Sequence, residues 1–124
     1  MLFLILGTSK CPYCQKAKKL LDNHQKDTSY IYVNLLLEYG DEWRSIFNDL
    51  KTLINGQKSI PLVFQLKGGK ATRGWSKEVR ELSTSELVQP EILSKYFDFQ
   101  GGYTELESKI NAFFATPLEL DDDY

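Results

Sequence analysis

The sequence predicts an α/β fold, with a four-stranded mixed sheet flanked by helices. A short apolar run at Leu2–Leu6 is typical of a strand, the stretch Cys14–Asn23 has the periodicity of an amphipathic helix, and Tyr30–Val33 is again strand-like. This strand–helix–strand order implies two parallel strands joined by a right-handed crossover. The later strands are joined through a turn, so we expect them to pair antiparallel.

The first half of the chain is assigned from residue type. Leu2–Leu6 is apolar at every position, as a strand buried on both faces would be. In the helix at 14–23, apolar and lysine side chains fall on opposite faces. Tyr30–Val33 is aromatic and β-branched, which favours a second strand. Apolar residues at steps of three and four predict a second helix over Asp41–Ile54, ended by Asn55-Gly56.

A third strand is predicted at Ile60–Leu66. Pro61 agrees with this position, because proline is tolerated only near the start of a strand or at a sheet edge. A turn follows at Lys67–Lys70. In the polar stretch beyond the turn we expect helical pieces near Ser76–Leu87 and after Pro90.

The last elements are a strand and a helix. The strand is predicted at Tyr96–Phe99 and is followed by Gly101-Gly102. Thr104 and Glu107 have the spacing of a capping box, which predicts Thr104 as the N-cap of the last helix. Residues 118–124 are rich in aspartate, and we expect a frayed, solvated tail there.

Length and composition predict one domain over residues 1–117, with an insertion at 67–94 and an acidic tail at 118–124. A net charge of −2 gives no basic surface for nucleic acid or an anionic membrane. No apolar stretch approaches the ~20 residues of a membrane span. The alternative that Leu2–Leu6 belongs to a secretory signal is disfavoured by its shortness and its lack of a positive flank. We therefore expect a cytoplasmic protein, and a monomer.

The segment Cys11-Pro12-Tyr13-Cys14 lies where a buried strand gives way to a helix. The N–H groups and the dipole of a helix N-terminus favour a thiolate on Cys11, and Lys10 adds a nearby positive charge. With two residues between them, Cys14 can reach Cys11 and resolve a mixed disulfide formed there. In this context the spacing is a redox signature of the thioredoxin-like fold, with Cys11 as nucleophile and Cys14 as resolving thiol.

Other interpretations of these residues stay open. A structural zinc site needs four ligands, whereas the chain has two cysteines and one histidine, so we expect no metal. The cysteines could instead be buried and inert. His24, near the end of the first helix, is expected to be solvated or to cap that helix, rather than to act as a ligand or base.

Three separated segments resemble the glutaredoxin family. Cys11-Pro12-Tyr13-Cys14 is similar to its dithiol active site, and Ser59-Ile60-Pro61 is similar to its Thr-Val-Pro segment, whose proline is cis. Gly101–Leu106 is similar to the family's Gly-Gly turn, which precedes a small polar residue and an Asp. The resemblance covers residues 1–66 and 95–115 and implies the glutaredoxin variant of the thioredoxin-like fold.

The resemblance also implies a glutathione site. In such a site the backbone of Ile60 would pair with the cysteinyl group, Lys58 would pair with the glycyl carboxylate, and Tyr13 would cover the sulfur pair. The N–H groups after the Gly-Gly turn would bind the γ-glutamyl carboxylate. The implied glutathione-binding residues are Lys10, Tyr13, Lys58, Ile60, Pro61, Gly102, Tyr103, Thr104 and Glu105.

The chain departs from the family pattern in three places. Thr8 stands where the family usually has a lysine, three residues before the first cysteine, and the nearby lysine is Lys10. Glu105 stands in place of the customary Asp. The insertion at 67–94 replaces a tight hairpin turn, and it is either a tolerated surface insertion or a docking surface for a partner protein.

The implied function is that of a glutathione-dependent thiol–disulfide oxidoreductase. It would reduce protein disulfides, glutathionylated thiols or both, with glutathione as co-substrate and ribonucleotide reductase as one substrate by analogy. One alternative is a thioredoxin-like reductase recharged by a flavoprotein. Others are an iron–sulfur cluster carrier and a catalytically silent interaction module built around the insertion.

Overall fold

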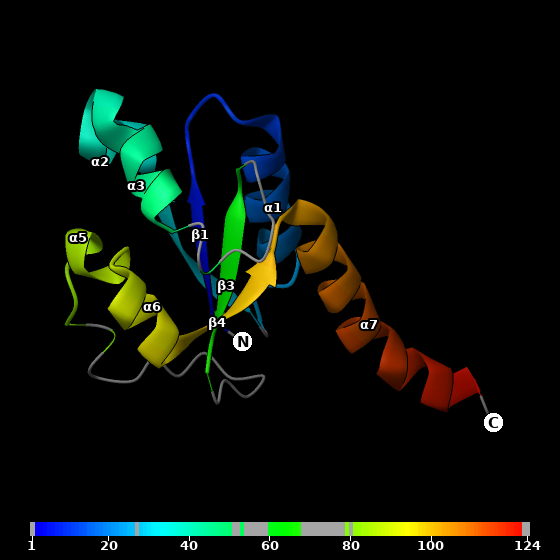
Figure 1. The fold of residues 1–124 in the computed structure, drawn as a ribbon. Coiled ribbons are helices and arrows are strands. Elements are labelled where there is room, and N and C mark those ends of the chain that lie inside the picture. Colours follow the sequence, from blue (N-terminus) through cyan, green and yellow to red (C-terminus); the bar gives the residue numbers. More distant parts are fainter. Residues whose placement is uncertain are drawn as a thin grey trace.

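The computed structural model describes residues 2–26, 28–50, 53, 60–67, 79 and 81–122, with the backbone alone at 99–100 and 115–122. Four strands form one mixed sheet in the order β2-β1-β3-β4 (Figure 1). They are β1 Leu2–Gly7, β2 Ser29–Asn34, β3 Leu62–Leu66 and β4 Phe97–Gly101. β1 pairs parallel with β2 and antiparallel with β3, and β3 pairs antiparallel with β4. The predicted fold class is confirmed.

Helices cover both faces of the sheet (Figure 1). One face is covered by α1 and α7, and the other by α2, α3, α5 and α6. The helical elements in the described part of the chain are α1 Pro12–Asp22, α2 Leu35–Tyr39, a 3₁₀ turn at Gly40–Glu42, α3 Trp43–Asp49, α5 Thr84–Leu87, α6 Pro90–Tyr96 and α7 Tyr103–Asp122.

The apolar run of β1 supplies both halves of the core. Phe3 and Ile5 pack with side chains of α1 and α7, whereas Leu2, Leu4 and Leu6 pack with those of the opposite layer. All five side chains are buried. Because successive side chains of a strand point to opposite faces, an unbroken apolar run is what a central strand requires.

The segment after β2 forms two helices, in contrast to the single helix predicted at Asp41–Ile54. α2 begins after Asn34, whose side-chain oxygen accepts a hydrogen bond of 3.1 Å from the backbone N–H three residues on. It ends at Tyr39 and is followed by Gly40, whose φ of 58° is in the left-handed region that favours glycine. α3 confirms the first half of the predicted helix, and residues 54–59, with the predicted stop at Asn55-Gly56, lie outside the described residues.

The insertion contributes to the core. Val79, Leu87, Val88 and Leu93 are buried against the face of the sheet that carries the even-numbered residues of β1. A surface insertion that merely extends a turn would leave such side chains exposed. This part of the chain therefore completes one layer of the domain.

The helices of the insertion partly match the prediction. α5 at Thr84–Leu87 confirms the end of the predicted piece near Ser76–Leu87, and Val79 is also helical. The predicted start near Ser76 lies outside the described residues. The start of α5 is set by a capping box, in which the Ser83 hydroxyl accepts from the Glu86 N–H and the Glu86 carboxylate accepts from the Ser83 N–H at 3.0 Å. α6 begins at Pro90, as predicted.

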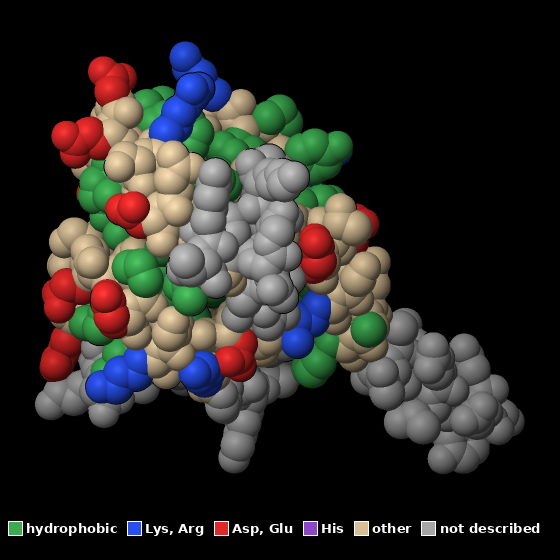
Figure 2. Space-filling view, in the orientation of Figure 1, with side chains coloured by type: hydrophobic (Ala, Val, Ile, Leu, Met, Phe, Trp, Pro, Cys, Tyr) green, Lys and Arg blue, Asp and Glu red, His purple; other side chains and the backbone are tan. Residues whose placement is uncertain are grey.

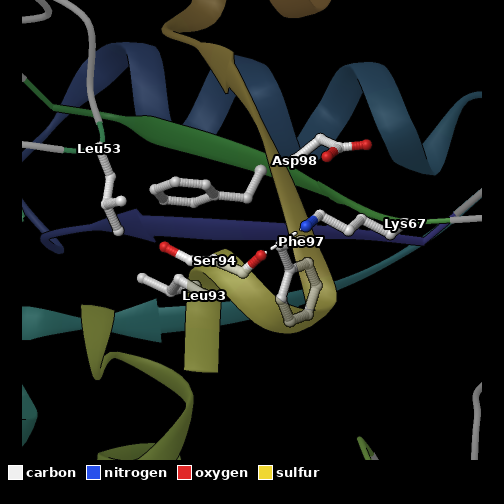
Figure 3. A pocket seen from close by; sticks show the side chains of 7 residues that line it. Leu53, Lys67, Leu93, Ser94, Phe97 and Asp98 are labelled. Carbon is white, nitrogen blue, oxygen red and sulfur yellow. Dashed lines mark hydrogen bonds between the residues drawn. The ribbon is translucent and has the colours of Figure 1, made fainter. Parts of the chain in front are cut away.

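The two ends of the insertion meet beside the sheet. The Lys67 ammonium donates to the Ser94 carbonyl oxygen at 2.5 Å, and the Lys67 N–H donates to the Tyr96 carbonyl oxygen at 2.8 Å. Figure 3 shows the first of these bonds at a pocket of about 240 Å³. The pocket is lined by Leu53, Phe64, Lys67, Leu93, Ser94, Phe97 and Asp98. A lysine near the carboxyl end of α6 is also favoured by the helix dipole.

α7 is longer than predicted. Its backbone is helical to Asp122, through most of the segment at 118–124 that we expected to be a frayed tail. Residues 123–124 lie outside the described residues. None of the helices within the described ranges is long and apolar enough to cross a lipid bilayer.

Candidate functional site

Cys11 and Cys14 form a disulfide at the first turn of α1. Cys11 is the N-cap of the helix, and its sulfur accepts a hydrogen bond of 3.1 Å from the Cys14 N–H. The Cys11 side chain is 8% exposed, whereas Cys14 is fully buried at 0%. The two sulfurs are thus bonded as a pair, and Cys11 keeps a small exposed surface whereas Cys14 keeps none.

The local sequence explains this arrangement. β1 ends at Gly7, and the Thr8 carbonyl oxygen then accepts a hydrogen bond of 3.2 Å from the Cys11 N–H, which closes a tight turn. Pro12 occupies the first helical position, where its missing N–H leaves no bond unmade. The chain therefore passes from strand to helix with Cys11 at the N-terminus of α1.

Electrostatics favour a thiolate at Cys11 when the pair is reduced. The partial positive charge of a helix N-terminus lowers the pKa of a cysteine placed there. In this chain the N–H of Cys14 points at the Cys11 sulfur. Lys10, the adjacent residue, is exposed.

Gly7 was not predicted to belong to the site. A Cβ atom at this position would overlap the Cys14 sulfur and would lie 3.2 Å from the Cys14 Cβ. The Tyr32 ring is on the same side, 3.6 Å from that Cβ position. Only a hydrogen fits between β1 and the buried cysteine. A glycine at the end of a buried strand is the signal that could have indicated this close approach.

Pro61 lies at the same end of the sheet as the cysteines. The Ile60–Pro61 peptide bond is cis, as the family resemblance implied. Leu62, the first residue of β3, is paired with Leu6 near the carboxyl end of β1. Antiparallel pairing therefore places Pro61, which is buried, next to the strand end from which the cysteine loop begins.

The Gly-Gly turn reaches this end as well. Gly101, the last residue of β4, is paired with Val63 of β3. Its φ of 109° is rarely adopted by other residues. Two of the three segments that carried the family resemblance, together with the described part of the third (Ile60 and Pro61), are thus brought together by the sheet, although they are far apart in the sequence.

The start of α7 corrects the predicted capping box. The helix begins at Tyr103, so Thr104 lies inside the first turn and is not the N-cap. The Gly102 N–H donates a hydrogen bond of 3.2 Å to the Glu105 carboxylate. The predicted pair was Thr104 and Glu107, whereas the observed pair, with the same spacing of three residues, is Gly102 and Glu105. A glutamate can reach back in this way, as in other capping boxes.

Tyr13 and Tyr103 lie side by side at the edge of the site. Their ring centroids are 5.7 Å apart, with an interplanar angle of 44°. Tyr13 is 54% exposed and Tyr103 is half-buried. The Tyr103 hydroxyl donates to the Glu107 carboxylate at 2.8 Å, and this bond is the main reason why the pKa of Tyr103 is raised. Glu107 was not predicted as a site residue.

The remaining candidates are placed as follows. Ile60 is half-buried next to Pro61, and Thr104 and Glu105 are exposed at the start of α7. Lys58 lies outside the described residues. The His24 ring stacks on Phe114 of α7 at 4.0 Å and 13°, so it packs at the far end of α1 and not at the cysteines. Within the described residues, no group of three or more His, Cys, Asp or Glu side chains is placed to hold a metal ion.

A family model described as Glutaredoxin matches residues 3–70, more than half of the 124 residues. The matched range includes the cysteine pair and the cis-proline, and it ends before the Gly-Gly turn. A search of curated proteins finds no match, and a search of solved structures finds none.

Proposed function

The chain belongs to the glutaredoxin family, and on this premise we propose that it is a glutathione-dependent oxidoreductase. Family membership together with the paired cysteines indicates thiol–disulfide exchange as the class of chemistry. The finer proposal is that the enzyme reduces protein disulfides and glutathionylated thiols, with glutathione as co-substrate.

The difference between the two cysteines carries this proposal. Cys11 is the more accessible sulfur and is held at a helix N-terminus, where a thiolate is stabilised. Cys14 is buried behind it and can reach only Cys11. Cys11 is therefore proposed as the nucleophile and Cys14 as the resolving thiol.

The proposed reaction is a series of exchanges. The Cys11 thiolate attacks a substrate disulfide, which forms a mixed disulfide and releases one substrate thiolate. The Cys14 thiolate then attacks the Cys11 sulfur, releases the second substrate thiolate and leaves the Cys11–Cys14 disulfide. Two glutathione molecules reduce that disulfide in turn and leave as glutathione disulfide. With a glutathionylated substrate, Cys11 takes up the glutathionyl group and a second glutathione removes it.

The proposed glutathione site follows the convergence of the three segments. The backbone of Ile60, before the cis-proline, is proposed to pair with the cysteinyl group, because β3 begins only at Leu62. The Gly102 N–H donates to Glu105, so the γ-glutamyl carboxylate is proposed to bind the N–H groups of Tyr103 and Thr104.

The other expected contacts are proposed at the edges of this site. Tyr13, which is exposed beside the sulfur pair, would cover the bound peptide. Lys10 and Lys58 would supply positive charge for the carboxylates of glutathione. The protein substrates are proposed to be disulfide-bearing proteins in the cytoplasm, of which ribonucleotide reductase is one by analogy.

Two cysteine variants test the assignment. Cys11→Ser should lose both reduction of a protein disulfide and deglutathionylation of a peptide, measured with glutathione and glutathione reductase. Cys14→Ser should lose the first activity and keep the second, because glutathione can replace the resolving thiol.

Three results would contradict the proposal. Equal loss of both activities in Cys14→Ser would reject the assigned roles. Activity of the native protein with a flavoprotein reductase, but not with glutathione, would reject glutathione as the co-substrate. If the wild-type protein is inactive both with glutathione and with a flavoprotein reductase, the proposal that it is an oxidoreductase is rejected.

A further inference from the structure

Four side chains from α1 and α7 form a continuous row at the edge of the cysteine site. The Lys16 ammonium lies 4.8 Å from the centroid of the Tyr13 ring, and that ring is 5.7 Å from the Tyr103 ring. Tyr103 in turn donates to Glu107 at 2.8 Å. We call Tyr13 and Tyr103 the aromatic rim. The Lys16 ammonium therefore contacts one end of the rim, and the Glu107 carboxylate contacts the other.

The two helices place this row beside the cysteine pair. Tyr13 follows Cys11 by two residues in α1, and Tyr103 is the first residue of α7. Figure 1 shows the first turns of α7 next to α1, and Tyr103 also packs on the core that these two helices share. Tyr13, by contrast, is 54% exposed, and its ring contacts Lys16 and Tyr103.

An exposed aromatic side chain can sample several rotamers, and ordering it on binding has an entropic cost. The bond from Tyr103 to Glu107 fixes the second ring of the rim in advance. The pKa of Tyr103 is raised by this bond, so its hydroxyl keeps the proton it donates to a higher pH than an ordinary tyrosine does. Tyr103 is therefore held in place before any ligand arrives, and it gives the Tyr13 ring a fixed neighbour.

We propose that Glu107 is a positioning residue for glutathione, acting through Tyr103 on Tyr13. The proposal rests on the proposed function, and it concerns ligand affinity and not the chemistry at the sulfurs. Glu107 does not touch the reacting atoms. It should affect glutathionylated substrates, whose peptide would lie along the rim, more than disulfides that carry no glutathione.

The experiment compares four variants in turnover of a glutathionylated peptide. Glu107→Ala and Tyr103→Phe each remove one partner of the hydrogen bond, and each should raise KM about threefold with kcat unchanged. The double variant should be no worse than either single variant, because one bond is lost in all three. Glu107→Gln keeps an acceptor oxygen and should restore most of the wild-type KM.

Two controls separate positioning from folding. Asn111→Ala changes an exposed residue one turn further along α7 and should leave KM unchanged. Single-turnover reduction of an intramolecular peptide disulfide, which carries no glutathione, by the pre-reduced Glu107→Ala enzyme should match that of the wild type. If Glu107→Ala does not fold, Tyr103→Phe and Glu107→Gln still test the bond.

Several results would overturn the inference. These are an unchanged KM in both single variants, additive effects in the double variant, or an equal loss with both substrates. Each would leave the proposed function intact, provided that the wild type turns over the glutathionylated peptide. A wild type that does not do so would reject the proposed function first.

Discussion

Gly7 determines how closely the buried cysteine approaches the sheet. Its Cα lies against the Cys14 sulfur, with no room for a methyl group. Because the sulfur is held by the bond to Cys11, it has no other position available in the oxidised protein. The site thus depends on the absence of a side chain as much as on the two thiols.

Gly7→Ala should destabilise the oxidised protein by about 1–3 kcal/mol, the usual cost of overpacking a buried position. The cost should fall when the protein is reduced, since the Cys14 side chain can then turn to another rotamer. Urea unfolding of both redox forms measures it. Gly40→Ala is the matched control, because its methyl group meets nothing within 4 Å and its cost comes from a φ of 58° alone. An equal cost of Gly7→Ala in both redox forms would contradict the explanation.

At the scale of residues, the sequence predicts the two cysteines that the structure joins and misses Gly7 and Glu107, which lie near them. Cys11 and Cys14 are recognisable from their spacing after an apolar strand. The cap of α7 is misplaced because Thr104 and Glu107 have the more usual composition, whereas the structure uses Gly102 and Glu105. Gly102 has no side chain that could cap the helix. The start of α7 is therefore marked only by the hydrogen bond from the Gly102 N–H to the Glu105 carboxylate.

Among the elements, the insertion shows most clearly how packing adds to what pattern predicts. α5 and α6 are short, yet their apolar side chains are buried on the sheet. Pro90 signals the start of α6, and the Ser83–Glu86 capping box was available as a signal for α5. Whether such a polar segment folds onto a sheet depends on contacts between residues that are distant in sequence. The periodicity of the segment itself gives no information about those contacts.

Leu93→Ala should cost about 2–5 kcal/mol of unfolding free energy, as for other buried leucines. Leu93 belongs to α6, is 1% exposed and packs in the core. Leu37→Ala is the matched control on α2, because that leucine is 79% exposed and should cost less than about 0.5 kcal/mol. Urea midpoints of the oxidised proteins give both values. Similar midpoints for the two variants would show that the insertion does not stabilise the domain.

The second helical region illustrates a different limit. The apolar spacing after Asp41 correctly indicates α3, but the break before it comes from the left-handed backbone of Gly40. The cap at Asn34 was a usable sign that a helix starts directly after β2. Caps and single glycines set the boundaries of elements, while apolar spacing sets only their faces.

For the whole molecule, tyrosine side chains with raised pKa values link stability to alkaline pH. Burial is the main cause that raises the pKa values of Tyr30, Tyr32 and Tyr39 above the ordinary value of 10.0. In the unfolded chain these phenols ionise near pH 10, whereas in the folded protein they keep their protons to higher pH. The folded state therefore binds more protons in that window, and its stability should fall as the pH rises above about 10.

Urea unfolding at several pH values between 8 and about 11 measures this effect. Tyr32→Phe should reduce the slope above pH 10, since it removes one of the groups. At neutral pH the same variant should be neutral or slightly stabilising, because the Tyr32 hydroxyl is buried with no hydrogen-bond partner among the described residues. A stability that is constant from pH 8 to about 11 would contradict the linkage.

The overall architecture was the most predictable level. A buried first strand, a helix and a second strand define the parallel pair, and the sheet order follows from the antiparallel return of β3 and β4. The convergence of Cys11, Pro61 and Gly102 at one end could be foreseen only through the family resemblance. Local sequence patterns do not indicate that these three residues, which are distant in sequence, lie at the same edge of the sheet.

The contact between Lys67 and Ser94 has a consequence for shortened forms of the chain. A direct connection between these positions would preserve the strand pairing, because the gap is already bridged by hydrogen bonds. It would also remove Val79, Leu87, Val88 and Leu93, and so let water reach Phe64 and its neighbours. A variant without the insertion would therefore need other apolar side chains to cover this face of the sheet. Without them, the shortened protein would expose an apolar surface and tend to aggregate.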